Sequence, residues 1–485
     1  MKRSLILNLL KSLNKIYFSS AANKEQKYKK VLFYTLKDMG GVYIKFLQTI
    51  STSELFMDDW GGPKEYEVFN KVPTENINIY KHFPNTNAFS YISPTPFASG
   101  SFAQVYKATL KNNKQVIIKV LRPSIVKNLK SDLRKLKMIL RIISPFLPSK
   151  IIDFNKAFEE FKEACLLETD YERETSNIKY FYNLYKNNNY VVIPKVYEEY
   201  SNKYVIVQDF IGGITLSDLM TETINNELLA DKVYKTLGSN IWTQMTIVGG
   251  EFLKMAITAD YVFGDPHPGN IILLPDNKVA LIDFGIIAHK PKSQKAFYLW
   301  TQSFYNVLQG KEDVSNLFIA TGNCFCPDLF NAFSTQNYSN TSVQDIISKA
   351  LSKKVDLING NNNDAKSLLE SGHVFKYFTR VLDKNNALNI KIDANNFQLL
   401  KAMQLYLGTL GTLDDKYGNN YFSEMLKNAM KYALDYSDKF GIKNDLIPDN
   451  KYSTNESYEI IIDFISSLAN NDEFLFSNIY ERMFK

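Results

Sequence analysis

Apolar residues recur at helical spacing through residues 4–19 and 27–50, which predicts helices near the start of the chain. The pattern then changes, because residues 102–110 and 115–121 alternate or run apolar on either side of the polar stretch Lys111–Lys114. Two such runs joined by a short polar turn predict a β-hairpin.

Long helical patterns follow at 125–143 and 153–186, and beyond Gly213 the chain is mostly helical. Short apolar runs predict further strands at 191–196, 204–208, 271–274 and 279–282. Residues 58–96 and 359–364 are rich in turn-forming or polar residues and predict loops. Strands grouped with a long helix and followed by a helical half indicate an α+β fold with two lobes.

Composition and charge exclude several classes of protein. The 485 residues are 45% hydrophobic, which is ordinary for a globular protein and excludes wholesale disorder. The net charge is +6, but only seven of the 57 cationic residues are Arg. Because Arg is the residue that recognises phosphates and guanines bidentately, this small, Arg-poor surplus argues against a nucleic-acid partner.

The cysteines and histidines do not form a recognisable framework. Three cysteines, an odd number, suit a reducing compartment, and Cys324 and Cys326 lie too close together for the usual zinc spacing. The four histidines show no zinc-helix signature. We therefore expect neither a disulfide framework nor a structural metal.

The first 22 residues contain no acidic residue and carry four cations among leucines and isoleucines. Such a segment is compatible with an organelle transit peptide or a membrane-surface helix, but the pattern favours an amphipathic helix of the folded protein. No run of 18 apolar residues occurs, so we expect no transmembrane helix.

The strongest chemical signal is the stretch Gly264–Asn270 followed by Asp283-Phe284-Gly285. An Asp (Asp265), an Asn five residues later (Asn270) and Asp-Phe-Gly after two short strands form the protein-kinase catalytic arrangement. Phosphoryl transfer needs charge neutralisation more than covalent help, so an Asn and an Asp must converge on Mg²⁺. Chance explains a lone Asp-Phe-Gly, but not this ordered pair.

A second signal lies upstream, where Lys119 ends an apolar strand that follows the small-residue loop Ala98, Ser99, Gly100 and Ser101. A kinase places its phosphate-binding loop and its phosphate-binding Lys in this order. Such a Lys needs an acidic partner on a helix. Residues 168–174 offer Glu168, Asp170, Glu172 and Glu174, and the sequence alone does not choose between them.

Taken together, these pieces resemble the UbiB/AarF family of atypical kinases, the coenzyme Q-biosynthesis kinase-like proteins. The matching segments occur in family order: Lys45–Gln48, Ala98–Ser101 with Ala103–Val105, Lys119–Pro123, Glu168–Glu174, Asp265–Asn270 and Asp283–Gly285. The resemblance implies a bilobal kinase-like fold. It divides the chain into an N-terminal helical extension covering the active site (1–90), an N-lobe (91–210) and a helical C-lobe with a C-terminal extension (211–485).

The resemblance also implies a role for each matching residue. Lys119 would bind the α- and β-phosphates of ATP and pair with Glu174. Asp265 would be the catalytic-loop Asp, with Asn270 and Asp283 as Mg²⁺ ligands. The occluding residues implied are Lys45, Gln48, Glu168 and Asp170, with Lys45 near Glu168 and Asp170. ATP would lie between the lobes on Ala98–Ser101, with adenine against the hinge formed by Gln208, Asp209 and Phe210.

Two departures from the family pattern stand out. Leu47 replaces the Gly of Lys-x-Gly-Gln, which puts the placement of Gln48 in doubt more than that of Lys45. Ser99 and Gly100 replace the usual successive Ala, and Gly100 should ease ATP binding. Independently, no Ala-Pro-Glu follows Asp283–Gly285, so a peptide-docking segment is missing and protein substrates are disfavoured.

The function that follows is an ATP-dependent phosphotransferase or ATPase with Mg²⁺ that supports ubiquinone or isoprenoid-lipid metabolism. Its expected partners are a nucleotide, a lipid or membrane surface, and lipid-biosynthesis proteins. The expected location is cytoplasmic or peripheral to a membrane, or mitochondrial or in another organelle if the N-terminus is a transit peptide. Two alternatives are a small-molecule kinase of the choline or aminoglycoside type, which lacks the Lys45 and Glu168 elements, and a nucleotide-gated scaffold with little turnover.

Overall fold

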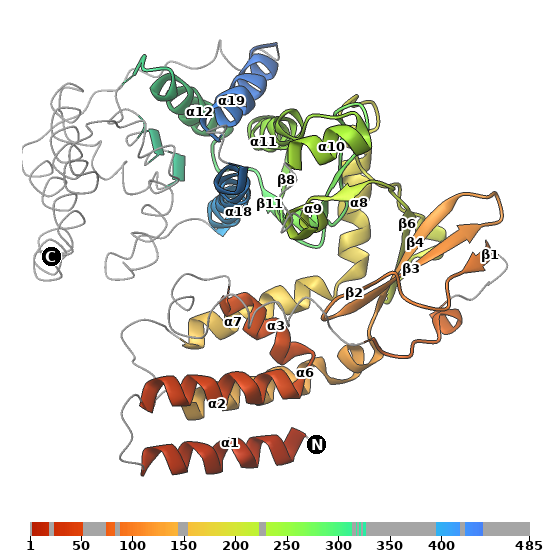
Figure 1. Ribbon diagram of the computed structural model, residues 1–485, viewed down its shortest axis with the longest axis vertical. Helices are drawn as coiled ribbons and strands as arrows, with labels where there is room; N and C mark the ends of the chain where they lie inside the picture. Colours follow the sequence, from red (N-terminus) through yellow and green to blue (C-terminus); the bar gives the residue numbers. More distant parts are fainter. Residues whose placement is uncertain are drawn as a thin grey trace, which may run out of the picture. The chain divides into compact units, whose positions relative to one another are not determined.

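The computed structural model describes most of the chain up to residue 312 and two later helices (Figure 1). The described residues are 2–18, 24–51, 74–82, 88–143, 154–222, 229–312, 317, 320–321, 324–325, 394–417 and 422–439. The chain divides into two compact units, Met1–Leu184 with Pro194–Ile211 (unit 1) and Tyr185–Ile193 with Gly212–Lys485 (unit 2). The predicted loop at 359–364 and Cys326 lie outside the described residues.

Unit 1 contains an antiparallel sheet with strand order β1-β3-β4-β6, and β2 pairs with β3. The strands are β1 (Phe89–Ile92), β2 (Ala98–Ser99), β3 (Ala103–Leu110), β4 (Gln115–Leu121) and β6 (Val205–Asp209). The predicted hairpin is confirmed as β3–β4, and Asn113 takes a left-handed φ of 66° in its turn, a conformation that Asn tolerates. The sequence prediction missed β1, which lies in the turn-rich segment.

Helices form the other part of unit 1, and Figure 1 shows α1, α2 and α3 stacked with α6 and α7. They are α1 (Lys2–Tyr17), α2 (Lys24–Met39), α3 (Val42–Ser51), α6 (Pro123–Ile143), α7 (Phe154–Glu168) and α8 (Tyr171–Tyr185). A single hydrophobic core joins the N-terminal helices to α6 and α7 and includes Leu36, Phe46, Leu136 and Phe161. The apolar face of α1 enters this core through Leu9 and Leu13, so α1 is an amphipathic helix of the fold, as the pattern favoured.

Two predicted helices are each broken in the structure. The pattern at 27–50 is interrupted by Gly40 and Gly41, whose φ values of 68° and 54° end α2 in a left-handed turn that Gly adopts without strain. The pattern at 153–186 is interrupted before α8, where Asp170 Oδ1 accepts a hydrogen bond from the Arg173 amide at 3.0 Å. A side chain that caps a helix in this way starts a new helix.

Unit 2 contains a four-stranded sheet of order β5-β10-β9-β7 and a separate ribbon in which β8 pairs with β11. The strands are β5 (Val191–Val192), β7 (Ile214–Thr215), β8 (Tyr261–Phe263), β9 (Ile271–Leu273), β10 (Val279–Leu281) and β11 (Ile287–His289). β5 is shorter than the predicted run 191–196, because Pro194 lacks the N–H that a continuing strand would need.

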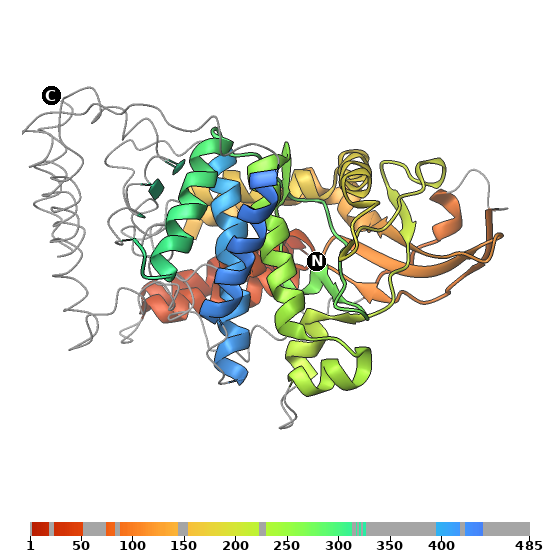
Figure 2. The ribbon, with the colours of Figure 1, turned by 90° about the horizontal axis from the view of Figure 1, so that it is seen from above.

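The helices of unit 2 assemble around α11, an almost wholly buried helix. They are α9 (Leu216–Glu222), α10 (Leu229–Leu237), α11 (Ile241–Thr258), α12 (Gln294–Leu308), α18 (Ala394–Tyr417) and α19 (Phe422–Lys439). Figure 2 shows α12 and α19 beside α11. α18 lies next to α19 and contacts α11 through the Tyr406 hydroxyl, which donates to Met245 O. No helix in the described ranges combines the length and the hydropathy needed to cross a bilayer.

A buried carboxylate ties α11 to its neighbours. Glu251 is 1% exposed, and its oxygens accept hydrogen bonds from Tyr185 at 2.9 Å, from Asn188 at 3.0 Å and from Tyr432. Lys254, one helical turn further along, forms an ion pair with the same carboxylate. A buried charge is tolerated only with such partners, so this cluster fixes how α19 packs on α11.

Candidate functional site

Lys119 lies on the face of β4 opposite the hydrophobic core of the sheet. Ile118 and Val120 point into that core, so strand alternation turns Lys119 to the other face. There its ammonium donates to Glu174 Oε1 on α8 at 2.7 Å and lies 5.4 Å from the centre of the Tyr171 ring. The Glu174 side chain is only 3% exposed, so the pair is a partly buried ion pair.

The break between α7 and α8 separates the four acidic residues of segment 168–174. Glu168, at the end of α7, accepts from Lys45 of α3 at 3.1 Å (Oε1) and lies 2.9 Å from it through Oε2. Asp170 caps α8, Glu172 is exposed, and Glu174 pairs with Lys119. The two Lys–Glu pairs are those that the family resemblance implied. Gln48 lies in α3, and its side chain is outside what the structure describes.

The small-residue loop forms the tight end of the β2–β3 ribbon. Ala98 pairs with Val105 and Ser99 with Gln104, and the Gly100 amide donates to Ala103 O at 2.9 Å. A Cβ at Gly100 would meet only Ala103 O, at 3.7 Å, which is ordinary contact. The turn itself therefore has room for Ala at this position, and Ser101 is already buried in it.

The three hinge residues have their side chains engaged within unit 1. The Lys114 ammonium donates to the Asp209 carboxylate at 3.2 Å, and this hydrogen bond raises the pKa of Lys114. The same carboxylate accepts from the Tyr197 hydroxyl at 2.9 Å. The Phe210 ring lies 6.1 Å from that of Phe97 in a T-shaped contact, and Gln208 is buried.

The main-chain amides of the hinge are also used. The Asp209 amide donates to Lys195 O, and that of Phe210 donates to Gln115 O. A main-chain donor to an adenine ring would therefore have to come from beyond Phe210, a position that the sequence reasoning did not include.

Unit 2 holds the other group of predicted site residues at one end of the β9–β10 pair. Asn270 directly precedes β9, and Asp283 follows β10. The strands are antiparallel, and the Ile282 amide donates to Asn270 O at 3.2 Å, so both residues lie at the same end of the ribbon. The Asn270 amide nitrogen donates to Asp265 Oδ2 at 2.9 Å, which brings Asp265, the predicted catalytic-loop Asp, to the same end of the ribbon.

Contacts with neighbouring backbone and side chains explain which residues flank Asp265, Asn270 and Asp283. A Cβ at Gly264 would lie 2.8 Å from the backbone of Ile287 on β11, so only Gly permits the close approach just before Asp265. His267 Nδ1 accepts from the Gly269 amide at 3.1 Å and starts the 3₁₀ turn Pro268–Asn270. Phe284 is fully buried against Phe263, 5.5 Å between ring centres, and this contact fixes its neighbour Asp283.

The oxygen donors of this group fit Mg²⁺. With its nitrogen given to Asp265, the Asn270 amide presents its oxygen as the acceptor, and Asp283 adds a carboxylate whose Oδ1 accepts from the Gly285 amide. Within the described residues no cluster of three or more His, Cys, Asp or Glu could hold a metal. Mg²⁺ commonly takes one or two protein ligands plus phosphate oxygens and water, so the oxygens of Asn270 and Asp283 are a donor set of the kind that it uses.

One buried residue of this region has no predicted role. Arg122, three residues after Lys119, is 3% exposed and contacts the Ser99–Gly100 loop. The signal available in the sequence was an Arg between the end of an apolar strand and a Pro, which by itself indicates no burial.

Comparisons with known proteins point to one family. The ABC1 atypical kinase-like domain matches residues 75–314. An uncharacterized protein in the hydrogenase 1 5′ region of Clostridium pasteurianum is 28% identical over 71% of this chain and 65% of its own length. A probable protein kinase UbiB of Marinobacter nauticus is 29% identical over 52% of this chain and 46% of its own.

A chloroplastic protein of Arabidopsis thaliana, ACTIVITY OF BC1 COMPLEX KINASE 3, is 28% identical over 43% of this chain and 28% of its own length. The matched parts thus span from 28% to 65% of these relatives. The solved structure of Rv3197 with erythromycin, from Mycobacterium tuberculosis, aligns with a TM-score of 0.46 at 18% identity, covering 86% of this chain and 95% of that one. Through residues 75–314, the chain belongs to the ABC1 (UbiB/AarF) family of atypical kinase-like proteins and has its α+β kinase-like fold.

Proposed function

We propose that this chain binds Mg²⁺–ATP and works as an atypical kinase or ATPase in ubiquinone or related isoprenoid-lipid metabolism at a membrane surface. The observation that carries the proposal is the ion pair between Lys119 and Glu174 at 2.7 Å. A Lys held by a helix Glu at the end of an apolar strand is the kinase device for neutralising nucleotide phosphates. The grouping of Asp265 and Asn270 in unit 2 supports it independently.

The residues would divide the chemistry as follows. Lys119 would hold the α- and β-phosphates, and Glu174 would fix the direction of its ammonium. Asn270 and Asp283 would hold Mg²⁺, which supplies neutralisation of the phosphate charge when bound. Asp265 would accept the proton from the attacking hydroxyl or water.

The acceptor is proposed to be water or a small lipid-related hydroxyl compound. Between Gly285 and α12 the chain forms only the short strand β11, and no Ala-Pro-Glu segment is present to dock a peptide.

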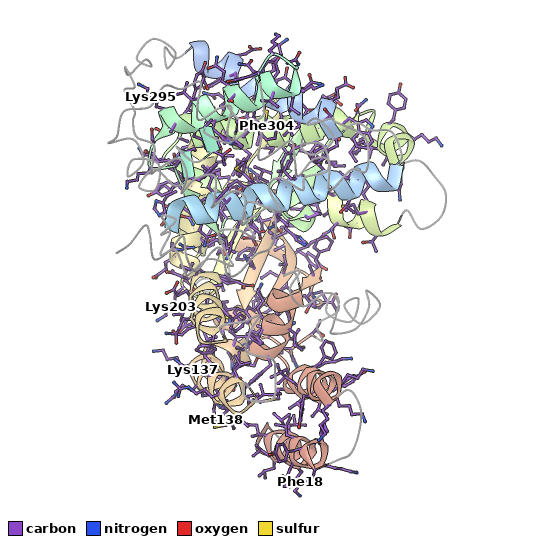
Figure 3. The ribbon with its side chains drawn as sticks, turned by 90° about the vertical axis from the view of Figure 1, so that its left-hand side faces the viewer. Phe18, Lys137, Met138, Lys203, Lys295 and Phe304 are labelled. Atoms are coloured by element: carbon purple, nitrogen blue, oxygen red, sulfur yellow. The ribbon has the colours of Figure 1, made fainter. Side chains whose placement is uncertain are left out.

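The membrane part of the proposal is supported by the exposed face of α1. Leu7 of α1 is 58% exposed and lies four residues, about one helical turn, before exposed Lys11 on the same face. Phe18, which directly follows the helix and is labelled in Figure 3, is 78% exposed. Exposed apolar side chains beside cations favour an anionic lipid surface. The chloroplastic location of the Arabidopsis relative supports an organelle as the alternative location.

A thermal-shift titration with ATP and ADP, with and without Mg²⁺, tests the nucleotide proposal. A ligand that binds only the folded state raises the melting temperature by mass action. We expect a shift that grows with Mg²⁺ in the wild-type chain, and loss of the Mg²⁺-dependent part in Asp283→Asn. Full retention of that part in Asp283→Asn would remove the metal assignment, and no shift with any nucleotide would reject the proposal.

Product analysis separates the remaining alternatives. Phosphate release without an acceptor, stimulated by lipid, supports the ATPase function. Strict dependence on a soluble alcohol would instead support a small-molecule kinase.

A further inference from the structure

A buried polar cluster lies directly beneath the small-residue loop of unit 1. The Arg122 side chain is 4% exposed, and its guanidinium points at the loop rather than at solvent. Nε donates to Gly100 O at 2.9 Å and Nη2 donates to Ser99 Oγ at 2.7 Å. Nη1 lies 3.6 Å from Glu75 Oε1, which supplies the balancing charge.

Glu75 is itself fixed by its neighbours. Its amide donates to Gln104 Oε1 at 2.5 Å, and its carbonyl accepts from Gln104 Nε2 at 3.1 Å. Its carboxylate accepts from the amide of Ser124 at 3.3 Å and from the hydroxyl of the same residue. Gln104 is completely buried, so this cluster is a fixed part of the fold rather than a mobile surface contact.

The other side of the loop is held by apolar packing. Phe102 is 2% exposed and belongs to the same core as Tyr43 and Phe46 of α3 and Ile125 of α6. Its carbonyl also accepts from the Arg122 amide at 2.9 Å. The loop is therefore anchored through Arg122 at Ser99 and Gly100 and through the helical core at Phe102.

We propose that Arg122 is a positioning residue, which, together with Phe102, holds loop 98–102 in one conformation before nucleotide binds. The proposal rests on the proposed function, because it gives this loop the role of contacting nucleotide phosphates. A loop fixed in advance loses less conformational entropy on binding, so affinity increases without any new ligand contact. The planar fork of Arg reaches Ser99, Gly100 and Glu75 at once, which a Lys ammonium cannot reproduce.

The test uses the full chain with Arg122→Lys, Ser99→Ala and the control Arg134→Lys. Arg134 is an exposed arginine of α6, so the control makes the same chemical change away from the loop. Amide hydrogen exchange is first measured without nucleotide. We expect faster exchange within residues 98–103 in Arg122→Lys, a smaller increase in Ser99→Ala, and no change in the control or in β4.

Nucleotide binding and turnover are then compared in the same variants. We expect Arg122→Lys to weaken the affinity for Mg²⁺–ATP about tenfold, the size of one lost charged hydrogen bond, and to raise KM while kcat stays within about twofold. Unchanged loop exchange in Arg122→Lys overturns the inference, whatever happens to affinity. If loop exchange is faster in Arg122→Lys but the wild-type chain binds no nucleotide, the anchoring role of Arg122 is supported and the proposed function is rejected.

Discussion

At the scale of single residues, the sequence is most informative where chemistry depends on short spacing. Asp265 and Asn270 are five residues apart, and the structure joins them by a hydrogen bond of 2.9 Å. The choice of Glu174 as the partner of Lys119 depends instead on a helix break before α8, which turns Glu168 and Glu174 toward different lysines. A pattern that reads 153–186 as one helix cannot make that choice.

The Lys119–Glu174 pair leads to a prediction about stability. Because Glu174 is 3% exposed, replacing Lys119 by Met leaves a buried charge without its partner, and we expect a loss of roughly 3–5 kcal/mol in the free energy of unfolding. Glu174→Gln in the same chain removes the charge, so the double variant should recover much of that loss. Urea unfolding of the four chains measures the coupling, and a double variant no more stable than Lys119→Met would contradict the argument.

At the scale of elements, most strands and helices follow from periodicity, while their ends follow from residues that periodicity ignores. Gly40 and Gly41 divide one predicted helix, Asp170 divides another, and Pro194 shortens β5. Strands of two or three residues such as β7 and β8 have too few positions to show alternation, so only their partners in the sheet define them.

The packing of α18 on α11 makes a second prediction. A Cβ added at Gly249 would overlap the hydroxyl oxygen of Tyr406, which donates to Met245 O at 2.8 Å. Gly249→Ala must displace Tyr406, so we expect a loss of about 1–3 kcal/mol in the stability of unit 2. The control is Gly408→Ala in α18, where a Cβ meets nothing within 4 Å and helix propensity predicts a gain of up to about 1 kcal/mol. Thermal unfolding that moves both variants in the same direction would be incompatible with this packing.

At the scale of the whole molecule, the sequence predicted an α+β kinase-like chain with an N-terminal helical extension. It did not predict which parts of the chain share a hydrophobic core with that extension. Phe102 of the loop and Phe46 of the extension, 56 positions apart in the sequence, belong to one core. Such contacts depend on tertiary packing and leave no local periodicity. The extension and the sheet of unit 1 consequently belong to one compact unit, and α1 carries exposed apolar side chains, Leu7 and Leu10, on the side away from its core.

That exposed face of α1 supports a prediction for the full chain. Leu9 and Leu13 face the core, so Leu7 and Phe18 on the opposite side can be changed without opening it. In vesicle sedimentation with phosphatidylcholine and phosphatidylglycerol, we expect Leu7→Gln combined with Phe18→Gln to reduce binding roughly tenfold or more, given the transfer energy of two large apolar side chains.

Binding by the wild-type chain should also fall as salt is raised, because Lys11 and Lys15 attract the anionic surface through a screened interaction. Leu184→Gln, a 48% exposed leucine of α8, serves as the control and should bind like the wild type. Equal binding by the double variant and this control would mean that α1 is not the membrane-facing element.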